Sequence, residues 1–517
     1  MKLSLLSTSD VHGYVMPTQY GSRHQDAAFG LAKVASVIKE EKLKNTTLCV
    51  ETGDFIQGSP LSYYIAKNDQ HEVSELMAVA NKIGYDVGIV GNHEFNYGFD
   101  YLKKAVAAAD YPIISANIID KKTEKPVFEP YQIFEKDGVK IGVIGVTTQY
   151  IPHWENPHHI EGLAFESIIP VVKSYVEQLR PNVDVLVVAY HGGFEHDLET
   201  GEPTEALTGE NEGYALLQEV EGIDALITGH QHRRIATKVN GVPVVQPGFR
   251  GQFIGKISLE LEEKDGRYRI IDSEASLIDM DDVTVDDEVV ATIHNVNEEV
   301  ENWLDQPLAH VVKGSMIIDD PHAARLSEHP YIEFIQKVQM EATGADISGT
   351  ALFNNEGKGF NDTITMRDIV TNYIYPNTLA VERLTGKELK AAMEQSLTFF
   401  TINENGELII TPRFVEPKPQ YYNYDMYEGI DYIADLTKPE GERLVSVTYH
   451  GHELADDEVV EVVMNQYRAV GGGNFAMFSA DKIVKEVQID MTELIADYLM
   501  RHKEIEATSN HNFELRY

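Results

Sequence analysis

The first half of the chain alternates short apolar runs with stretches whose apolar residues recur at helical spacing. The helical spacing, as in Ala32 to Lys44 and Val73 to Ile83, is typical of amphipathic helices. The short runs are typical of buried strands and span residues 3–7, 47–50, 87–90, 140–146, 185–188, 225–227 and 243–248. Two more runs, 257–261 and 268–271, flank turn residues and predict a closing hairpin. This alternation predicts a layered α/β unit.

The pattern changes after residue 280. Residues 281–305 are acidic with apolar residues at helical spacing, which predicts a connecting helix within 281–308. The remainder predicts helices at 331–343, 384–396 and 491–502, a strand at 459–464 and a triple glycine at 471–473. A chain of 517 residues is too long for one ordinary domain. We therefore expect two domains, 1–280 and 309–517, joined by that helix.

Charge narrows the classes of partner. The formal net charge is −40, from 83 acidic and 43 basic residues. This balance disfavours nucleic-acid polymers and anionic membranes, because both require a concentrated basic surface. It does not exclude a small anionic substrate, since bound divalent cations reverse the local field. No run approaches the roughly 18 consecutive apolar residues of a membrane span.

The single cysteine, Cys49, lies in a strand-like run, where a buried and inert thiol is expected. Residues 1–9 contain the first predicted strand and no leader-like apolar region, so the sequence as written predicts a cytoplasmic protein. A chain trimmed of a signal peptide would read the same way and would be extracellular or located at the cell wall.

Five polar segments carry the candidate chemistry, and each follows a strand-like run. They read Asp10-Val11-His12, Gly53-Asp54, Gly91-Asn92-His93-Glu94, His191-Gly192-Gly193 and Gly229-His230-Gln231-His232. Side chains just beyond the carboxyl ends of strands can converge at one sheet edge. A mixture of Asp, Asn and His suits divalent metals and is too large for one tetrahedral zinc. The segments therefore predict a two-metal hydrolase.

We assign one ion to Asp10, His12, Asp54 and His232, and the other to Asp54, Asn92, His191 and His230. Asp54 would bridge the ions, which would lie about 3.5–4 Å apart. The ligand set suits Mn²⁺ or Zn²⁺, and iron is also compatible. Each segment alone has an ordinary explanation, since Asn92 could cap a helix beginning near Phe99 and Gly-Asp is common in turns. Their recurrence in order after strands favours the metal centre.

The five segments resemble the full motif set of the calcineurin-like metallophosphoesterases, and the C-terminal half resembles the substrate-binding domain of the 5′-nucleotidase family. Together these resemblances cover nearly the whole chain and imply an N-terminal four-layer αββα sandwich followed by a C-terminal α/β domain. Within the family, the chain is most similar to the bifunctional 2′,3′-cyclic-nucleotide 2′-phosphodiesterase/3′-nucleotidases. This similarity is carried by Gly91-Asn92-His93-Glu94-Phe95-Asn96-Tyr97-Gly98 and Tyr375-Pro376-Asn377-Thr378-Leu379.

The resemblance implies that His93 faces the substrate and does not bind metal. An imidazolium there would stabilise or protonate the leaving oxygen, an effect typically worth about 10²–10⁴-fold. Many 5′-nucleotidases carry an aspartate three residues later, whereas this chain has Asn96, as the cyclic phosphodiesterase branch does. Asn96 can orient His93 by hydrogen bonding but supplies no negative charge. Alternatively, the bond between these two residues only supports the loop.

Two aromatic residues match the family's clamp for the nucleotide base: Tyr424, and Phe475 just after the triple glycine. Such stacking is worth about 1–3 kcal/mol per base. Either ring could instead belong to the packed core. Further candidates for polar contacts to the nucleotide are Asn354, Asn355 and Asn377. Residues 354–361 contain no arginine, unlike the comparable segment of 5′-nucleotidases, which disfavours recognition by an arginine.

We expect a metal-dependent phosphoesterase that opens 2′,3′-cyclic nucleotides at the 2′ oxygen and then removes the 3′ phosphate. A 5′-nucleotidase or nucleotide-sugar hydrolase is the alternative on the same scaffold. A non-catalytic nucleotide-binding protein is the alternative from another class. It is disfavoured because all seven ligand positions carry competent side chains.

Overall fold

The computed structural model describes residues 1–517 except 24, 154, 206, 376, 417 and 488. The described chain divides into two compact units, Met1–Val300 and Glu301–Tyr517, and the boundary falls inside helix α7 (Asp287–Leu304). The helix predicted from residue 281 begins only at Asp287, because the Asp286 carboxylate accepts the N–H groups of Glu288 and Val289 and so caps its first turn.

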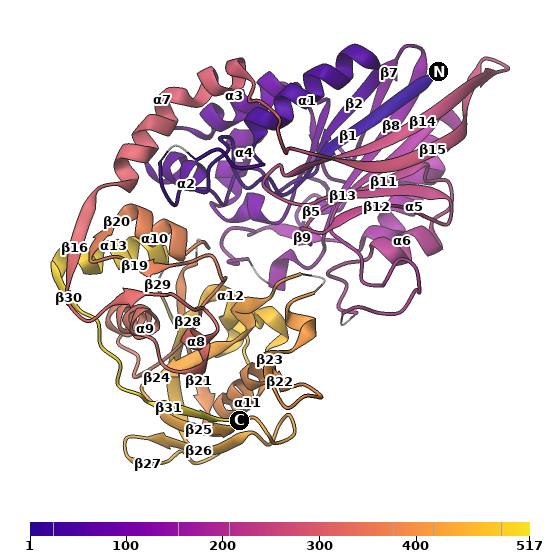
Figure 1. Cartoon of the computed structure of the whole chain (residues 1–517). Coiled ribbons are helices and arrows are strands. Elements are labelled where there is room, and N and C mark those ends of the chain that lie inside the picture. Colours follow the sequence, from indigo (N-terminus) through magenta and orange to yellow (C-terminus); the bar gives the residue numbers. More distant parts are fainter. Residues whose placement is uncertain (24, 154, 206, 376, 417, 488) are drawn as a thin grey trace. The chain divides into compact units, whose positions relative to one another are not determined.

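The N-terminal unit contains a six-stranded sheet of order β15–β14–β1–β2–β3–β4 (Figure 1). Its parallel strands are β1 (Lys2–Thr8), β2 (Thr46–Glu51), β3 (Val87–Ile89) and β4 (Ile113–Ile114). The helices between them are α1 (Leu31–Lys44), α2 (Pro60–Lys67), α3 (Val73–Ile83) and α4 (Phe99–Ala108). The predicted hairpin is longer than expected and consists of antiparallel β14 (Phe253–Lys264) and β15 (Arg267–Asp279).

A second six-stranded sheet has the order β12–β13–β11–β10–β8–β7. Its strands are β7 (Tyr131–Lys136), β8 (Val139–Thr147), β10 (Val185–His191), β11 (Ala225–Thr228), β12 (Arg234–Val239) and β13 (Val242–Pro247). The accompanying helices are α5 (Ile168–Leu179) and α6 (Gly213–Glu219). A small sheet contains β5 (Ile118–Asp120), β6 (Lys125–Pro126) and β9 (Leu163–Phe165).

Two apolar cores cover the two faces of the second sheet. The facing sides of the two sheets share one core, which includes Leu5 of the first sheet and Val187 of the second. The opposite side of the second sheet, with Val188, packs on Val172 of α5. Helix α1 packs against β2 of the first sheet. The predicted αββα layering is therefore confirmed. Because both faces of β10 are covered, residues 185–188 form a continuous apolar run.

The C-terminal unit is built on a five-stranded sheet of order β24–β18–β28–β21–β29. Its strands are β18 (Ile347–Ala351), β21 (Leu379–Thr385), β24 (Asp425–Glu428), β28 (Val459–Asn465) and β29 (Ile483–Val487). Its longer helices are α9 (Pro330–Thr343), α10 (Met366–Asn372), α11 (Gly386–Leu397) and α13 (Met491–Arg501). The predicted C-terminal α/β domain is therefore confirmed.

Smaller elements complete this unit. A four-stranded sheet contains β25 (Asp431–Asp435), β26 (Leu444–Tyr449), β27 (His452–Glu453) and β31 (Phe513–Arg516). Other short strands are β16 (Pro307–Lys313), β17 (Met316–Ile317), β19 (Gly359–Phe360), β20 (Thr363–Thr365), β22 (Phe400–Ile402), β23 (Leu408–Ile410) and β30 (Glu504–Glu506). The short helices α8 (Ala323–Leu326) and α12 (Gln466–Ala469) lie beside loops described below.

The helix predicted at 384–396 begins later than expected. Strand β21 continues through Thr385, and α11 starts at Gly386. The Thr385 hydroxyl accepts the Glu388 N–H at 3.3 Å, while the Glu388 carboxylate accepts the Thr385 N–H at 2.8 Å. This reciprocal capping box fixes the start of the helix and leaves the preceding apolar residue in the strand.

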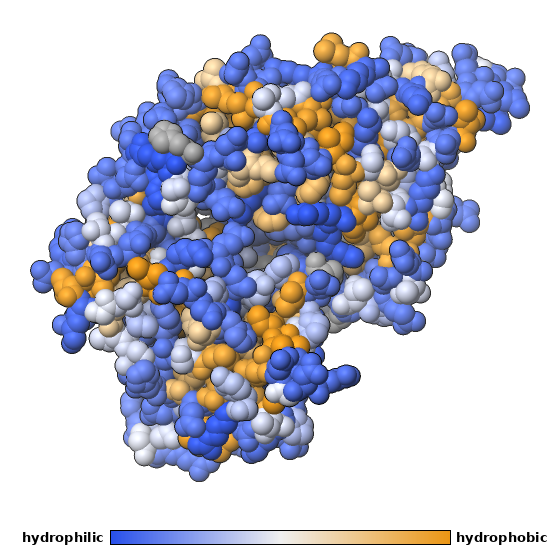
Figure 2. Space-filling model, in the orientation of Figure 1, coloured by the Kyte–Doolittle hydropathy of each residue, from blue (hydrophilic) through white to orange (hydrophobic). Residues whose placement is uncertain are grey.

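The surface agrees with the acidic composition. Figure 2 shows that hydrophilic residues cover most of the visible face, with apolar residues gathered in smaller patches. Within the part of the chain that the structure describes, no helix combines the length and apolar character needed to cross a membrane.

Candidate metal centre and substrate-binding edge

The predicted metal ligands lie at the carboxyl ends of strands β1, β2, β3, β10 and β11. Five of them have left-handed backbone: Asp10 (φ 53°), His12 (φ 50°), Asp54 (φ 58°), His230 (φ 67°) and His232 (φ 57°). Residues other than glycine rarely adopt this conformation, and it persists only where the surrounding structure enforces it, often at functional sites. The backbone of these loops therefore supports a functional centre at the strand ends.

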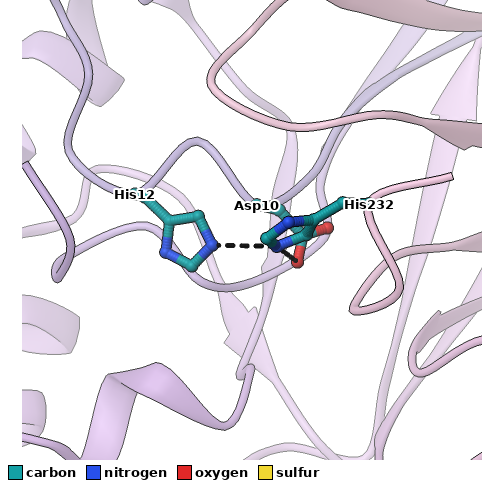
Figure 3. Close-up of side chains that lie close together, drawn as sticks. All are labelled: Asp10, His12 and His232. Carbon is teal, nitrogen blue, oxygen red and sulfur yellow. Dashed lines mark hydrogen bonds and ion pairs between the residues drawn. The ribbon is translucent and has the colours of Figure 1, made fainter. Parts of the chain in front are cut away.

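The first cluster contains Asp10, His12 and His232 (Figure 3). Nε2 of His12 lies 3.1 Å from Nε2 of His232, which lies 3.4 Å from Oδ1 of Asp10. Nδ1 of His12 lies 3.0 Å from the carbonyl oxygen of Gln57, to which it donates a hydrogen bond. His232 stacks on Phe249, with ring centroids 4.8 Å apart. These supports aim two imidazole nitrogens and a carboxylate at a common point.

The second cluster contains Asp54, His191 and His230, together with Asn92. Nε2 of His191 lies 3.1 Å from Oδ1 of Asn92 and 3.2 Å from Oδ2 of Asp54. Nδ1 of His230 lies 2.9 Å from the same amide oxygen, and its Nε2 lies 3.0 Å from Oε1 of Glu210. The four candidate ligands are all buried. The structure thus brings all seven predicted ligands into two groups.

The ligand atoms of the second cluster are arranged to surround a cation rather than to form hydrogen bonds with one another. Nδ1 of His191 donates to the Thr52 carbonyl oxygen at 2.6 Å, so Nε2 of the neutral ring carries a lone pair. That lone pair faces the oxygens of Asn92 and Asp54, which are also acceptors. Buried acceptors that face one another are unfavourable, so this arrangement requires either a proton on Nε2 or a metal cation among these atoms. Carboxylate, amide and imidazole donors together suit Mn²⁺, Zn²⁺ or iron.

Burial and charge set the protonation of these ligands. Burial lowers the pKa of His12 to about 3, against the opposing pull of Asp54. Burial raises the pKa of Asp10, but its hydrogen bond to His232 and the nearby imidazoles lower it to about 2. Burial lowers the pKa of His191, but the Asp54 carboxylate outweighs it and raises the pKa to about 10. An imidazole that binds a metal ion must lose that proton, so a metal ion at this site would bind more tightly as pH rises.

Glu94 links the loops that follow β2 and β3, a role that the sequence analysis did not assign. Its Oε2 accepts the N–H groups of Asp54 at 2.8 Å and Gly91 at 2.7 Å. Its Oε1 accepts those of Phe55 at 2.6 Å and Ile56 at 3.3 Å. One buried carboxylate therefore holds both ligand loops. In the sequence, this role of Glu94 is indicated by its position inside the third polar segment.

His93 belongs to neither ligand group, although it follows Asn92 directly. Its ring contacts the His12 ring edge to face at 5.3 Å, and its backbone N–H donates to Oδ1 of Asp54 at 2.8 Å. Nδ1 lies 2.6 Å from Oδ1 of Asn96. No described residue forms a hydrogen bond with Nε2. The ring is thus held beside the candidate metal ligands by its Nδ1 side.

The four predicted substrate contacts lie at one edge of the C-terminal unit's five-stranded sheet. Asn355 follows the end of β18, and Phe475 follows the end of β28, which runs parallel to β18. Asn377 precedes β21, and Tyr424 precedes β24; these two strands run antiparallel to β28 and β18, respectively. The topology therefore gathers four distant segments at the same edge.

Neither predicted clamp ring is open to solvent. Tyr424 is 1% exposed and stacks on Phe399 at 5.5 Å. Phe475 is 1% exposed, with the Arg468 guanidinium 3.8 Å from its ring centroid. Both rings are packed like core residues, and their clamp role stays a prediction. Tyr375, noted above only as part of a similar segment, is half-buried at this edge and is a further aromatic candidate.

Arg325, which lies outside residues 354–361, contacts the loop that holds Asn354 and Asn355. Nη1 of Arg325 donates to Oδ1 of Asn355 at 2.8 Å, and its Nη2 donates to the carbonyl oxygens of Leu352 at 2.8 Å and Asn354 at 3.2 Å. Arg325 belongs to α8 and is fully buried. Arg325 therefore supports this loop from a distant segment, and the expectation that no arginine recognises the nucleotide stays a prediction.

Comparisons with known proteins assign a family to each unit. Residues 3–234 match the calcineurin-like phosphoesterases, and residues 312–480 match the 5′-nucleotidase C-terminal domain. The 2′,3′-cyclic-nucleotide 2′-phosphodiesterase/3′-nucleotidase of Salmonella typhimurium is 30% identical, and the match covers 91% of this chain and 81% of that protein.

Two further relatives agree with this assignment. The trifunctional nucleotide phosphoesterase protein YfkN of Bacillus subtilis is 27% identical over 99% of this chain, which spans 39% of the length of that relative. A crystal structure from Staphylococcus aureus, provisionally named as a 5′-nucleotidase and in complex with alpha-ketoglutarate, is 35% identical. It has a TM-score of 0.94, with 100% of both chains covered.

Proposed function

Because the chain belongs to the calcineurin-like phosphoesterases that carry a 5′-nucleotidase C-terminal domain, we propose that it opens 2′,3′-cyclic nucleotides at the 2′ oxygen and then removes the 3′ phosphate. The reaction class, metal-dependent hydrolysis of nucleotide phosphoesters, is common to the family and its relatives. The choice of the cyclic substrate is the finer part of the proposal. It is supported by the Salmonella relative and by Asn96, where a plain 5′-nucleotidase would have an aspartate.

The observation that carries the reaction class is the convergence of seven donor side chains on two neighbouring points. The first point would be held by Asp10, His12, Asp54 and His232, and the second by Asp54, Asn92, His191 and His230. Asp54 would be the shared ligand, and its Oδ2 lies 3.2 Å from Nε2 of His191. When bound, two divalent ions supply the positive charge that stabilises phosphoryl transfer.

His93 would act on the leaving group. Its Nδ1 is held by Asn96, so the Nε2 side of the ring is the side that can meet a substrate oxygen. Breaking a phosphate ester expels an alkoxide, and protonation by a positioned imidazole contributes about 10²–10⁴-fold. Its backbone contact to Asp54 is made by the N–H, so the side chain can be removed without breaking that contact.

The C-terminal unit would bind the nucleotide through the sheet edge that carries Asn355, Asn377, Tyr424 and Phe475. Aromatic stacking on the base is worth about 1–3 kcal/mol and tolerates any base. Tyr375 is a half-buried ring at this edge, as are Tyr422 and Tyr467, whereas Tyr424 and Phe475 are packed. Substituting each ring separately and measuring KM identifies the residues that contact the base, and a contact residue raises KM more than it lowers kcat.

A 5′-nucleotidase is the second candidate, because the Staphylococcus aureus structure that matches the full chain carries that name. Both candidates use the same metal centre and differ in which ester oxygen of the ribose faces His93. The two hypotheses therefore predict the same effects of ligand substitutions and different substrate preferences.

A substrate panel tests the proposal. Purified protein loaded with Mn²⁺ or Zn²⁺ is assayed with 2′,3′-cyclic AMP, 3′-AMP and 5′-AMP, and we expect the first two to be hydrolysed faster. His93→Ala should keep its metal content while turnover falls by about 10²–10⁴-fold. His294→Ala, which removes an exposed histidine of α7, is the matched control and should keep full activity. Faster hydrolysis of 5′-AMP than of both other substrates would reject the cyclic assignment.

Metal analysis of the purified protein decides which ions it takes, since the ligand set accepts Mn²⁺, Zn²⁺ or iron. The small nucleotide is the proposed partner, and the acidic charge gives no support for a nucleic-acid polymer. The cytoplasmic location expected from the sequence stays a prediction.

A further inference from the structure

Glu155 lies behind the residue that holds His93. It follows the short 3₁₀ helix at Ile151–His153 and is 6% exposed. Its Oε2 accepts a hydrogen bond from Nδ2 of Asn96 at 2.7 Å. Its Oε1 accepts the N–H of Asn156 at 2.8 Å and lies 2.8 Å from Nδ1 of His159. The carboxylate therefore has partners on both oxygens and a defined orientation.

These bonds determine which way the Asn96 amide points. A carboxylate has no hydrogen to donate, so the amide must turn its NH₂ group toward Glu155. Its oxygen then faces His93, and Nδ1 of His93 lies 2.6 Å away. An amide oxygen only accepts, so Nδ1 must carry the hydrogen. The tautomer of His93 follows from the position of Glu155.

We propose that Glu155 is a positioning residue for His93, acting through the Asn96 amide to hold hydrogen on Nδ1 and to turn Nε2 toward the leaving oxygen. This inference rests on the proposed role of His93 in phosphoester hydrolysis. Glu155 also places a negative charge one side chain behind the position that carries an aspartate in many 5′-nucleotidases. In this His–Asn–Glu arrangement, Asn96 supplies the hydrogen bond to His93, and Glu155 supplies the negative charge one side chain further away.

The proton balance of the step is simple. The oxygen of a water molecule forms a bond to phosphorus and its proton passes to solvent, the P–O bond to the leaving alkoxide breaks, and the alkoxide takes the proton from Nε2 of His93. The ring is left neutral, with its Nδ1 hydrogen still donated to Asn96. Water restores the Nε2 proton before the next turnover. Glu155 neither gains nor loses a proton; it keeps the ring in the tautomer that the step requires.

Three variants test whether Glu155 orients His93 through Asn96, an arrangement that we call the relay. Glu155→Leu removes the acceptor, so Asn96 can turn over. Asn96→Asp places a carboxylate against Glu155, where two like charges repel. The double variant Asn96→Asp/Glu155→Gln restores a donor opposite an acceptor, because the amide introduced at position 155 can donate to the carboxylate introduced at position 96. Glu41→Gln, at another buried glutamate of this unit that pairs with Lys256, is the control.

The assay is the rate of hydrolysis of aryl phosphates whose phenols range from good to poor leaving groups. We expect Glu155→Leu and Asn96→Asp to lose about 10–100-fold on poor leaving groups, the usual effect of removing an orienting partner. They should lose little on p-nitrophenyl phosphate, which needs no acid. The double variant should recover most of the loss. A uniform loss across the series, or a double variant no better than Asn96→Asp, would overturn the proposal.

A second measurement does not require activity. Nitrogen NMR of histidine-labelled, metal-free protein, with the His93 signal identified by its loss in His93→Gln, reports which nitrogen carries hydrogen. We expect hydrogen on Nδ1 in the unmodified protein and in the Glu41→Gln control, and a mixture of tautomers in Glu155→Leu. An unchanged spectrum in Glu155→Leu refutes the relay. If the protein hydrolyses aryl phosphates but no nucleotide, the proposed substrate is wrong while the leaving-group comparison still decides the role of Glu155.

Discussion

Replacing Glu94 with glutamine is expected to loosen both ligand loops at once. Each carboxylate oxygen of Glu94 accepts two backbone N–H groups, those of Asp54 and Gly91 on Oε2 and those of Phe55 and Ile56 on Oε1. A glutamine side chain keeps the shape but has one accepting oxygen. Whichever way its amide turns, two backbone N–H groups lose their acceptor and face an NH₂ group.

The size of the effect follows from that count. A buried donor left without a partner costs about 1–3 kcal/mol, so two of them cost about 2–6 kcal/mol. Burial and the neighbouring Asp54 carboxylate raise the pKa of Glu94, which opposes the gain from its four donors. The lower half of the range is therefore the better expectation. The loss is local, because all four donors belong to the loops after β2 and β3.

Hydrogen exchange measured by mass spectrometry detects this loss at peptides that cover residues 54–56 and 91–95. We expect those amides to lose protection in Glu94→Gln, together with a lower urea midpoint for the N-terminal unit. Glu51→Gln is the matched control. Burial raises the pKa of Glu51 well above its usual range, and its carboxyl accepts one N–H, from Gly53, so glutamine closely resembles its protonated form. Equal protection in the two variants would refute the reasoning.

Three further outcomes are expected. His191→Ala removes a ligand of one group only, so metal analysis should find about half the metal of the unmodified protein. A chelator should lower the melting temperature of the N-terminal unit but not that of the C-terminal unit in calorimetry, since an ion at 100 times its Kd adds about 2.7 kcal/mol. Burial beside Glu333 raises the pKa of Glu328 from 4.5 to about 7, so its stabilising contribution is complete below about pH 4.5 and lost as pH rises through about 7. Glu328→Gln should flatten that decline in the unfolding free energy, measured at several pH values.

The candidate metal centre could be predicted because each candidate ligand is tied to a local pattern. A strand ends, the backbone turns, and a polar side chain lies at the last residue of the strand or within four residues of it. Parallel strands in one sheet end at the same edge, so the loops after β1, β2 and β3 converge by topology, and those after β10 and β11 converge in the same way on the second sheet. The left-handed backbone at Asp10 and His12 could not be inferred this way, since few residues other than glycine adopt it, although Asp and His do so more often than most.

The substrate edge was less accessible to sequence reasoning. An aromatic ring in a strand-rich segment has the same local pattern whether it packs in the core or faces a ligand. Tyr424 and Phe475 are packed, while Tyr375 is half-buried. Arg325 donates a hydrogen bond to Asn355, which lies 30 residues later in the chain. The sequence pattern around neither residue indicates that contact. Such contacts depend on how loops pack, which local periodicity does not encode.

Asn96 shows why a single position can mislead. Judged by its side chain alone, it supplies a hydrogen bond and no charge, which distinguishes it from the aspartate of many 5′-nucleotidases. The structure places the buried Glu155 carboxylate directly behind it, contributed by a residue 59 positions later. An amide between an imidazole and a carboxylate must point its oxygen one way and its nitrogen the other, so it transmits orientation even though it carries no charge. The comparison with aspartate therefore concerns the pair Asn96 and Glu155, and substitutions at either position have to be judged together.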